Sequence, residues 1–120
     1  AQGEGMILST VTGSTESRKA FLERYEARWG EPLPAESAFI AYAGTEVLIE
    51  ALTRVEASND LDVEALEKAW MELGSVPTLV GEARVTGRSV MYPLNLERVG
   101  EDGNLEVIGM CSETGCTMQE

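Results

Sequence analysis

Two cysteines near the C-terminus are the residues best suited to chemistry in this sequence. Cys111 and Cys116 are its only cysteines, and Gly115 beside Cys116 can make a tight turn. Because the chain has no histidine, two thiolates alone cannot complete a four-ligand zinc site. Their spacing is not that of a redox Cys-x-x-Cys motif. The pair is therefore either a small disulfide loop made in an oxidising compartment or two free thiols near a loose chain end, and we favour the disulfide.

The lack of histidine also limits what the chain could catalyse. It excludes the Ser-His-Asp and Cys-His arrangements used in nucleophilic catalysis, and the sequence contains neither a Gly-x-Ser-x-Gly motif nor a P-loop. Gly13 precedes a predicted helix, where an anion can bind, but glycine is common at strand-to-helix turns for structural reasons alone. Glu64 and Glu67 share a helix face, as many solvated carboxylates do. We therefore expect no enzymatic activity, no metal ion and no cofactor.

The composition is that of a small acidic globular protein. The chain has 120 residues, a mass of 13.0 kDa and 43% hydrophobic residues, which allows one small domain with a modest core. Its 21 acidic and 9 basic residues give a net charge of −12, which repels nucleic-acid phosphates and anionic lipids, so we expect neither as a partner. No apolar run approaches the roughly 20 residues of a membrane-spanning helix. No complete signal peptide is present, but a mature exported protein would have lost one.

One strand and three helices are predicted in the first two thirds of the chain. A short apolar run over residues 6–11 predicts a buried strand. The helices span residues 15–29, about 35–55 and 63–73. Their expected buried stripes are, in order, Phe21, Leu22, Tyr25 and Trp29; Ala38, Ala41, Tyr42, Thr45, Leu48, Ile49, Leu52 and Val55; and Leu66, Ala69, Trp70 and Leu73. Gly44 costs the second helix about 1 kcal/mol relative to alanine, which suggests that close packing requires it.

From Leu79 onward the pattern changes to that of strands. The apolar residues Val90, Tyr92, Leu94 and Leu96 alternate with Met91, Pro93, Asn95 and Glu97. This alternation predicts a half-buried strand, which Pro93 places at a sheet edge or a bulge. A turn over residues 100–103 and a return strand over residues 105–108 complete a β-hairpin.

These elements amount to a single partial α/β domain: three helices packed with a few short strands and a C-terminal β-hairpin. We expect a strand and three helices over residues 1–78, strands and the hairpin over 79–110, and a cysteine-containing tail over 111–120. The chain offers little sheet to cover three apolar helix faces. That shortage predicts missing sequence or a partner.

The order of these features resembles the last third of type 1 periplasmic binding proteins, the leucine/isoleucine/valine-binding family. Glu4-Gly-Met-Ile-Leu-Ser-Thr10 is similar to the family's hinge-crossing strand, and Phe21-x-x-x-Tyr25-x-x-x-Trp29-Gly30 to one of its helices. Ala38-Phe-Ile-Ala-Tyr42-Ala-Gly-Thr-Glu-Val-Leu-Ile-Glu-Ala-Leu52 resembles its Ala-Tyr-Asp-Ala…Ala-Leu helix. The segments Asp62-Val-Glu-Ala-Leu66, Gly81-Glu-Ala-Arg-Val and Glu101-Asp-Gly-Asn follow in the family's order. There are two departures: Ala43 or Gly44 stands where an acidic residue is usual, and the tail from Cys111 to Cys116 is unfamiliar.

This resemblance implies a ligand clamp and not an enzyme. Whole members of the family hold a small polar solute, such as an amino acid or an amide, between two α/β lobes and deliver it to the membrane subunits of an ABC transporter. It also implies a periplasmic or extracellular location. Most ligand-contacting residues of the family precede this segment, so the resemblance leaves Ser9, Thr10 and Tyr42 as the candidate ligand-binding residues. Each has a purely structural alternative: Ser9 and Thr10 would only pair through their backbone in a strand, and Tyr42 would be a core tyrosine.

A second hypothesis gives the same sequence a different role. The chain could be a truncated relative that forms a homo-oligomer, or completes another chain, through helix faces that a full receptor would cover. In that case it would bind no solute.

Overall fold

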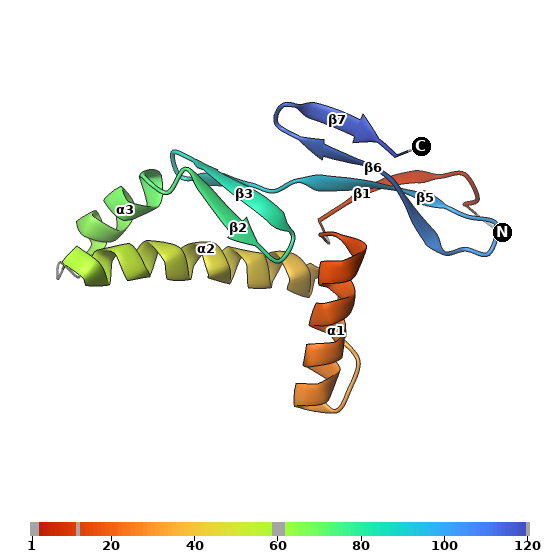
Figure 1. Cartoon of the computed structure of the whole chain (residues 1–120), viewed down its shortest axis with the longest axis horizontal. Coiled ribbons are helices and arrows are strands. Elements are labelled where there is room, and N and C mark those ends of the chain that lie inside the picture. Colours follow the sequence, from red (N-terminus) through yellow and green to blue (C-terminus); the bar gives the residue numbers. More distant parts are fainter. Residues whose placement is uncertain (1–2, 12, 59–61, 120) are drawn as a thin grey trace.

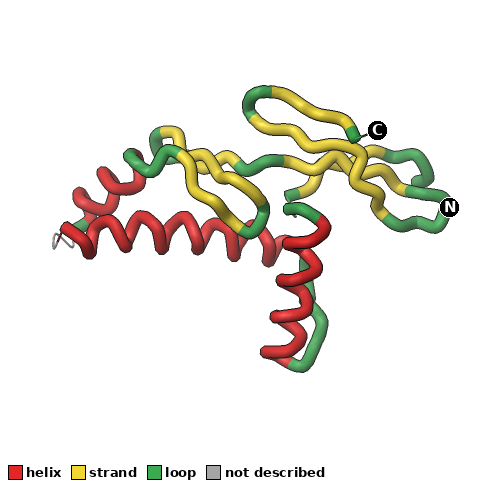
Figure 2. The backbone as a smooth tube through the Cα atoms, in the orientation of Figure 1, coloured by secondary structure: helices red, strands yellow, loops and turns green. Residues whose placement is uncertain are grey.

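The computed structural model describes residues 3–11, 13–58 and 62–119, and within them the chain forms three helices and seven strands in two small antiparallel sheets (Figures 1 and 2). The elements are β1 (Ile7–Thr10), α1 (Thr15–Trp29), α2 (Ser37–Ser58), α3 (Val63–Met71), β2 (Ser75–Thr78), β3 (Gly81–Thr86), β4 (Ser89–Met91), β5 (Leu94–Val99), β6 (Leu105–Ser112) and β7 (Gly115–Met118). This is the α/β fold that the sequence predicts.

The molecule is more extended than a compact domain of its length. Its radius of gyration is 17.0 Å, whereas a compact domain of this length has about 13.6 Å. Its accessible surface is 8171 Å², whereas a compact monomer of this mass exposes about 6,300 Å². The chain therefore leaves roughly 1,800 Å² uncovered that a compact protein would bury.

Helix α1 has the predicted bounds because both of its ends are capped. Ser14 Oγ accepts a hydrogen bond from the Ser17 backbone N–H at 3.1 Å, and Gly30 takes the left-handed conformation that ends the helix. The predicted apolar stripe is mostly not buried. Phe21 lies in the core, but Trp29 is 64% exposed because α1 points away from α2 instead of lying along it (Figure 1).

Helix α2 buries a different face from the one that its pattern predicts. The buried stripe follows every fourth residue: Phe39, Ala43, Val47, Ala51 and Val55. Apart from Val55, no residue of the predicted stripe is buried: Leu48 is 42% and Ile49 56% exposed, and Ala38 and Leu52 are half-buried. The prediction was wrong because α2 is apolar on two sides and the β2–β3 hairpin covers only one. The expectation that packing requires Gly44 is not supported either, since an added Cβ would lie 3.5 Å from the Tyr92 hydroxyl, an ordinary contact.

Helix α3 begins where predicted and ends two residues early. Asp62 caps it, with Oδ1 accepting a hydrogen bond from the Ala65 backbone N–H at 2.6 Å. Leu73 leaves the helix and enters the core, and Gly74 follows with a φ of 67°. Helix α2 ends at Ser58, and residues 59–61, which precede Asp62, lie outside the described residues.

The sheet β2-β3-β4 packs on α2 and forms the main core. Val76 of β2 and Ala83 and Val85 of β3 contact Val47 and Ala51 of α2. The single predicted strand over residues 90–96 is divided at Pro93, which lies between β4 in this sheet and β5 in the other. Proline has no backbone N–H to donate to a neighbouring strand, so the strand is interrupted there and the chain passes from one sheet to the other.

The second sheet has the order β1-β5-β6-β7, and its β5–β6 hairpin is the predicted one. Strand β1 was predicted to be buried, but Ile7 is 60% exposed, because β1 is an edge strand and one face of this sheet is uncovered. Strand β5 buries the residues that its alternation predicts to be exposed. Asn95 and Glu97 are buried, whereas Leu94 is 38% exposed.

Candidate functional site

Two of the three predicted ligand-binding residues lie on β1. Ser9 is exposed opposite Leu96 of β5, and Thr10 is half-buried opposite Asn95. Because successive strand residues point to opposite faces of a sheet, their side chains cannot share one face. Ser9 therefore belongs to the open face of the sheet, and Thr10 to the face that carries the buried Asn95.

The chain passes between the two sheets twice, and a hydrogen bond joins these crossings. Asn95 follows the crossing from β4 to β5, and its Nδ2 donates to the carbonyl of Gly13, which lies on the crossing from β1 to α1, at 2.7 Å. Gly13 has a φ of 74°, and an added Cβ would lie 2.7 Å from the Leu79 carbonyl oxygen. Only glycine fits this crossing without moving backbone.

Tyr42 lies elsewhere, in a cleft of about 500 Å³ between α1 and α2. Its ring is 41% exposed and meets Phe21 edge-on at a centroid distance of 5.0 Å, so it is not a core tyrosine in this chain. The lining residues are Phe21, Arg24, Tyr25, Arg28, Trp29, Leu33, Ala38, Ala41, Tyr42 and Thr45. Ser9 and Thr10 are not among them. This chain therefore does not gather its three candidate residues around one cavity.

The α1–α2 cleft is aromatic and carries two arginines, a feature that sequence reasoning missed. Tyr25 and Trp29 lie one helical turn apart with ring centroids at 6.4 Å, and the Arg28 guanidinium lies 5.5 Å from the centre of the Trp29 ring. Such surfaces bind flat or apolar groups by stacking, and Arg24 and Arg28 can add a carboxylate contact. The signal was present as aromatic residues at four-residue spacing, but it was interpreted as core packing.

A buried charge lies beneath the first turn of α1. Glu97 is 1% exposed, and its Oε1 lies 3.8 Å from Nη1 of Arg18. Arg18 also pairs with Glu36 and lies 5.8 Å from the centre of the Phe39 ring. Among the described residues, Oε2 of Glu97 has no hydrogen-bond partner. Sequence reasoning missed this group because it stands at a position whose alternation predicts exposure.

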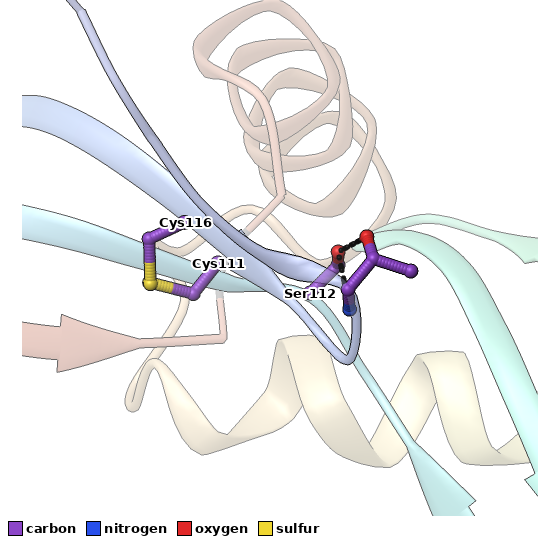
Figure 3. The surroundings of a disulfide bond; sticks show 4 residues. Cys111, Ser112 and Cys116 are labelled. Atoms are coloured by element: carbon purple, nitrogen blue, oxygen red, sulfur yellow. Dashed lines mark hydrogen bonds between the residues drawn. A yellow bond between two sulfur atoms is a disulfide. The ribbon is translucent and has the colours of Figure 1, made fainter.

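The predicted disulfide between Cys111 and Cys116 is present (Figure 3). The two residues are direct cross-strand partners in β6 and β7, so the bond closes the last turn of the sheet. Within that turn the Ser112 and Thr114 hydroxyls are 2.8 Å apart. Glu113 pairs with Arg84 of β3, which ties the hairpin to the other sheet. The segment predicted as a tail thus contains the end of β6 and the whole of β7.

Among residues 3–11, 13–58 and 62–119, no helix is long and apolar enough to cross a membrane. These residues also contain no cluster of three or more acidic or cysteine side chains able to hold a metal ion.

Comparison with known proteins identifies the fold. Neither the family models nor the curated proteins contain a match. An ABC transporter substrate-binding protein from Sphaerobacter thermophilus superposes on 92% of this chain with a TM-score of 0.69 and 24% identity. A leucine-binding protein from Thermotoga maritima superposes on 93% with a TM-score of 0.66 and 18% identity. This is the fold of one segment of a substrate-binding protein. The matched part is 32% of each solved chain, so this chain spans about a third of their length. The resemblance seen in the sequence is confirmed as a likeness of fold, and the rest of its implications are proposals.

Proposed function

We propose that this chain is one third of an exported solute-binding protein that supplies an ABC transporter with a branched-chain amino acid or a similar small polar solute. The observation that carries the proposal is the superposition of nearly the whole chain on two binding proteins of this class. The disulfide favours an oxidising compartment outside the cytoplasm. We propose no catalytic role, since the solved neighbours are binding proteins.

The two crossings support a clamp. The β1–α1 and β4–β5 connections are joined by the bond between Asn95 and the Gly13 carbonyl, and they link the β1-β5-β6-β7 sheet to the unit formed by the helices and the other sheet. A paired crossing of this kind can bend while keeping its strands in register, as a hinge between two lobes must. In this proposal Ser9 and Thr10 lie near the hinge, and Tyr42 lies on the helical unit.

A solute site needs more than this chain. Small-molecule sites usually enclose most of their ligand, whereas Ser9 is on an open sheet face and Tyr42 in an open cleft. We therefore expect the isolated chain to bind leucine, isoleucine or valine with no saturable heat up to millimolar concentration. Isothermal titration of the isolated chain tests this, and micromolar affinity would refute it.

The positive test uses the protein made by its native host. An antibody raised against this chain should detect a polypeptide about three times as long, because the matched part is 32% of each solved chain. That polypeptide should bind an aliphatic amino acid, and Thr10→Val or Tyr42→Phe should weaken binding more than the exposed control Thr86→Val. A longer polypeptide that binds none of these solutes would refute the proposal.

The roughly 1,800 Å² of uncovered surface also favours the second hypothesis, a short protein that dimerises without binding a solute. A native mass of 13.0 kDa together with a dimer in sedimentation would establish it. A native polypeptide three times as long would exclude it.

A further inference from the structure

The turn between β6 and β7 reaches beyond the sheet to which its strands belong. The last residue pair of β5 and β6 joins Leu94 to Cys111, and β5 begins directly after the crossing from β4. The turn residues that follow Cys111 therefore lie beside this crossing, at the end of the hairpin nearer to β3 (Figure 1). There Glu113 of the turn forms an ion pair with Arg84 of β3. This bridging pair links the two sheets without being part of either crossing.

The conformation of this turn is held on both sides of Glu113. Cys111 and Cys116 are cross-strand partners joined by the disulfide, one residue pair away from the turn (Figure 3). Within the turn the Thr114 backbone N–H donates to Ser112 Oγ at 3.3 Å, and the two hydroxyl oxygens are 2.8 Å apart. Since the backbone is already ordered, little further conformational entropy is lost when the Glu113 carboxylate pairs with β3.

Asn95 and Glu97 of β5 link the same sheet to the helical unit, which consists of the three helices and β2-β3-β4, at a different place. Asn95 donates to the Gly13 carbonyl at 2.7 Å, and Glu97 Oε1 lies 3.8 Å from Nη1 of Arg18. Both contacts reach the segment that follows β1, and β1 and β6 lie on opposite sides of β5 in the sheet. The bridging pair therefore adds a link on the β6 side, so that the two units are joined on both sides of the β4–β5 crossing.

We propose that the disulfide-closed turn is a latch, in which Glu113 holds Arg84 and thereby restricts the twisting of the helical unit against the β1-β5-β6-β7 sheet. Links that are spaced apart across a boundary resist twisting more strongly than links gathered at one point. In the two-lobed clamp proposed above, such a latch would set the angle at which the lobes face each other. The latch concerns the orientation of two units within this chain, so it goes beyond the proposed function and does not depend on a bound solute.

The latch is weak enough to open. The Arg84 and Glu113 side chains are 52% and 32% exposed, and an open cavity of about 280 Å³ lies between the turn and the strands β2 and β3. An exposed ion pair contributes little to stability and is screened by salt. Its loss should therefore raise the population of twisted orientations about threefold. A change of this size shifts the balance between orientations without disrupting either unit.

The test measures the distance between two spin labels, one on each unit, by pulsed electron paramagnetic resonance. Ile7→Cys on β1 and Val63→Cys on α3 provide the thiols, because Ile7 is 60% and Val63 80% exposed and the native cysteines are bonded to each other. Glu113→Gln should raise the population outside the wild-type distance range about threefold. The matched control is Glu106→Gln, which removes the 3.0 Å ion pair with Arg98 inside the β5–β6 hairpin and should leave the distances unchanged.

Two further variants test the ion pair and the disulfide separately. The charge-reversed variant Arg84→Glu/Glu113→Arg should restore the wild-type distance distribution, because it keeps one charge of each sign across the boundary. The variant Cys111→Ser/Cys116→Ser should broaden the distribution as Glu113→Gln does, because the turn no longer holds the carboxylate in place. In the wild type, about 1 M salt should have the same effect, since it screens an exposed ion pair.

A second label pair, Val63→Cys with Ile49→Cys, lies within the helical unit, and its distances should stay the same in every variant. An unchanged distribution between the units in Glu113→Gln would overturn the inference, and so would equal broadening in Glu106→Gln. Broadening in Glu113→Gln without broadening in the double cysteine variant would retain the ion pair and reject the role of the disulfide.

Discussion

Asn95 and Glu97 are two buried polar residues on one strand. Replacing each by an apolar residue should change the free energy of unfolding in opposite directions. Asn95 is 4% exposed and donates to the Gly13 carbonyl at 2.7 Å, whereas the Oε2 atom of Glu97 has no hydrogen-bond partner among the described residues. Asn95→Leu would leave a buried carbonyl without its donor. Glu97→Met would remove a buried oxygen that lacks one.

The magnitudes follow from what each substitution leaves behind. An unsatisfied buried group costs about 1–3 kcal/mol, so Asn95→Leu should lower the free energy of unfolding by about 2 kcal/mol. Glu97→Met avoids a cost of the same size but loses the 3.8 Å pairing with Arg18. That loss is small, because Arg18, unlike Glu97, is 29% exposed and keeps Glu36 as a partner, so the substitution leaves no unpaired buried charge. A net gain of about 1 kcal/mol is expected.

Urea denaturation followed by circular dichroism at neutral pH measures both changes, and thermal unfolding provides a check at about 4 °C per kcal/mol for this length. The conservative variant Glu97→Gln is the control, since it keeps the shape and still buries polar atoms, and it should gain less than Glu97→Met. A loss of 1 kcal/mol or more in Glu97→Met would refute the reasoning, because it would mean that both oxygens of Glu97 are satisfied in the folded protein.

Three further predictions concern other parts of the fold. Gly44→Ala should raise the free energy of unfolding by about 0.5–1 kcal/mol, since the added Cβ meets Tyr92 at an ordinary 3.5 Å, and a lower urea midpoint would contradict this. A thiol reagent should find no free thiol before reduction and two afterwards, and the double variant Cys111→Ser/Cys116→Ser should unfold more easily by about 2 kcal/mol. Burial raises the pKa of Tyr92 above 10.0. The contribution of Tyr92 to stability is therefore constant below pH 10 and is lost as the pH rises through the raised pKa. The cause is that, between the two pKa values, the unfolded chain releases the proton more readily than the folded chain. Tyr92→Phe should lose less stability than the wild type between about pH 9 and pH 11, and equal losses would contradict the assignment.

Features that depend on a few neighbouring residues were predictable from the sequence. Helix α1 has the predicted bounds because Ser14 and Gly30 cap it locally. The β5–β6 hairpin follows from the turn residues between its strands. The disulfide joins two cysteines that a tight turn brings together. In each case the interacting residues are close to each other in the sequence, so the sequence alone predicts the structure that they form.

The inner and outer sides of the elements were not predictable in the same way. Ile49 on α2, Leu94 on β5 and Ile7 on β1 all belong to patterns that predict burial, and all three are exposed. Hydrophobic periodicity reports the sides of an element that are suited to burial, but it does not say which neighbour covers each side. Where two sides are suited to burial and one cover is present, the pattern gives no way to choose between them.

The same reasoning explains why the candidate site was only partly predictable. Tyr42 was placed on a core stripe, and that stripe proved to be the open side of α2, beside the aromatic cleft. Ser9 was placed in a buried strand, and that strand is an open edge. Both residues were therefore assigned to surfaces that are suited to burial, and both surfaces are exposed in this chain. If the missing cover is the rest of a receptor, the environments of Ser9 and Tyr42 will differ most between the isolated chain and the longer polypeptide. The environment of Asn95, which is already enclosed, should be the same in both.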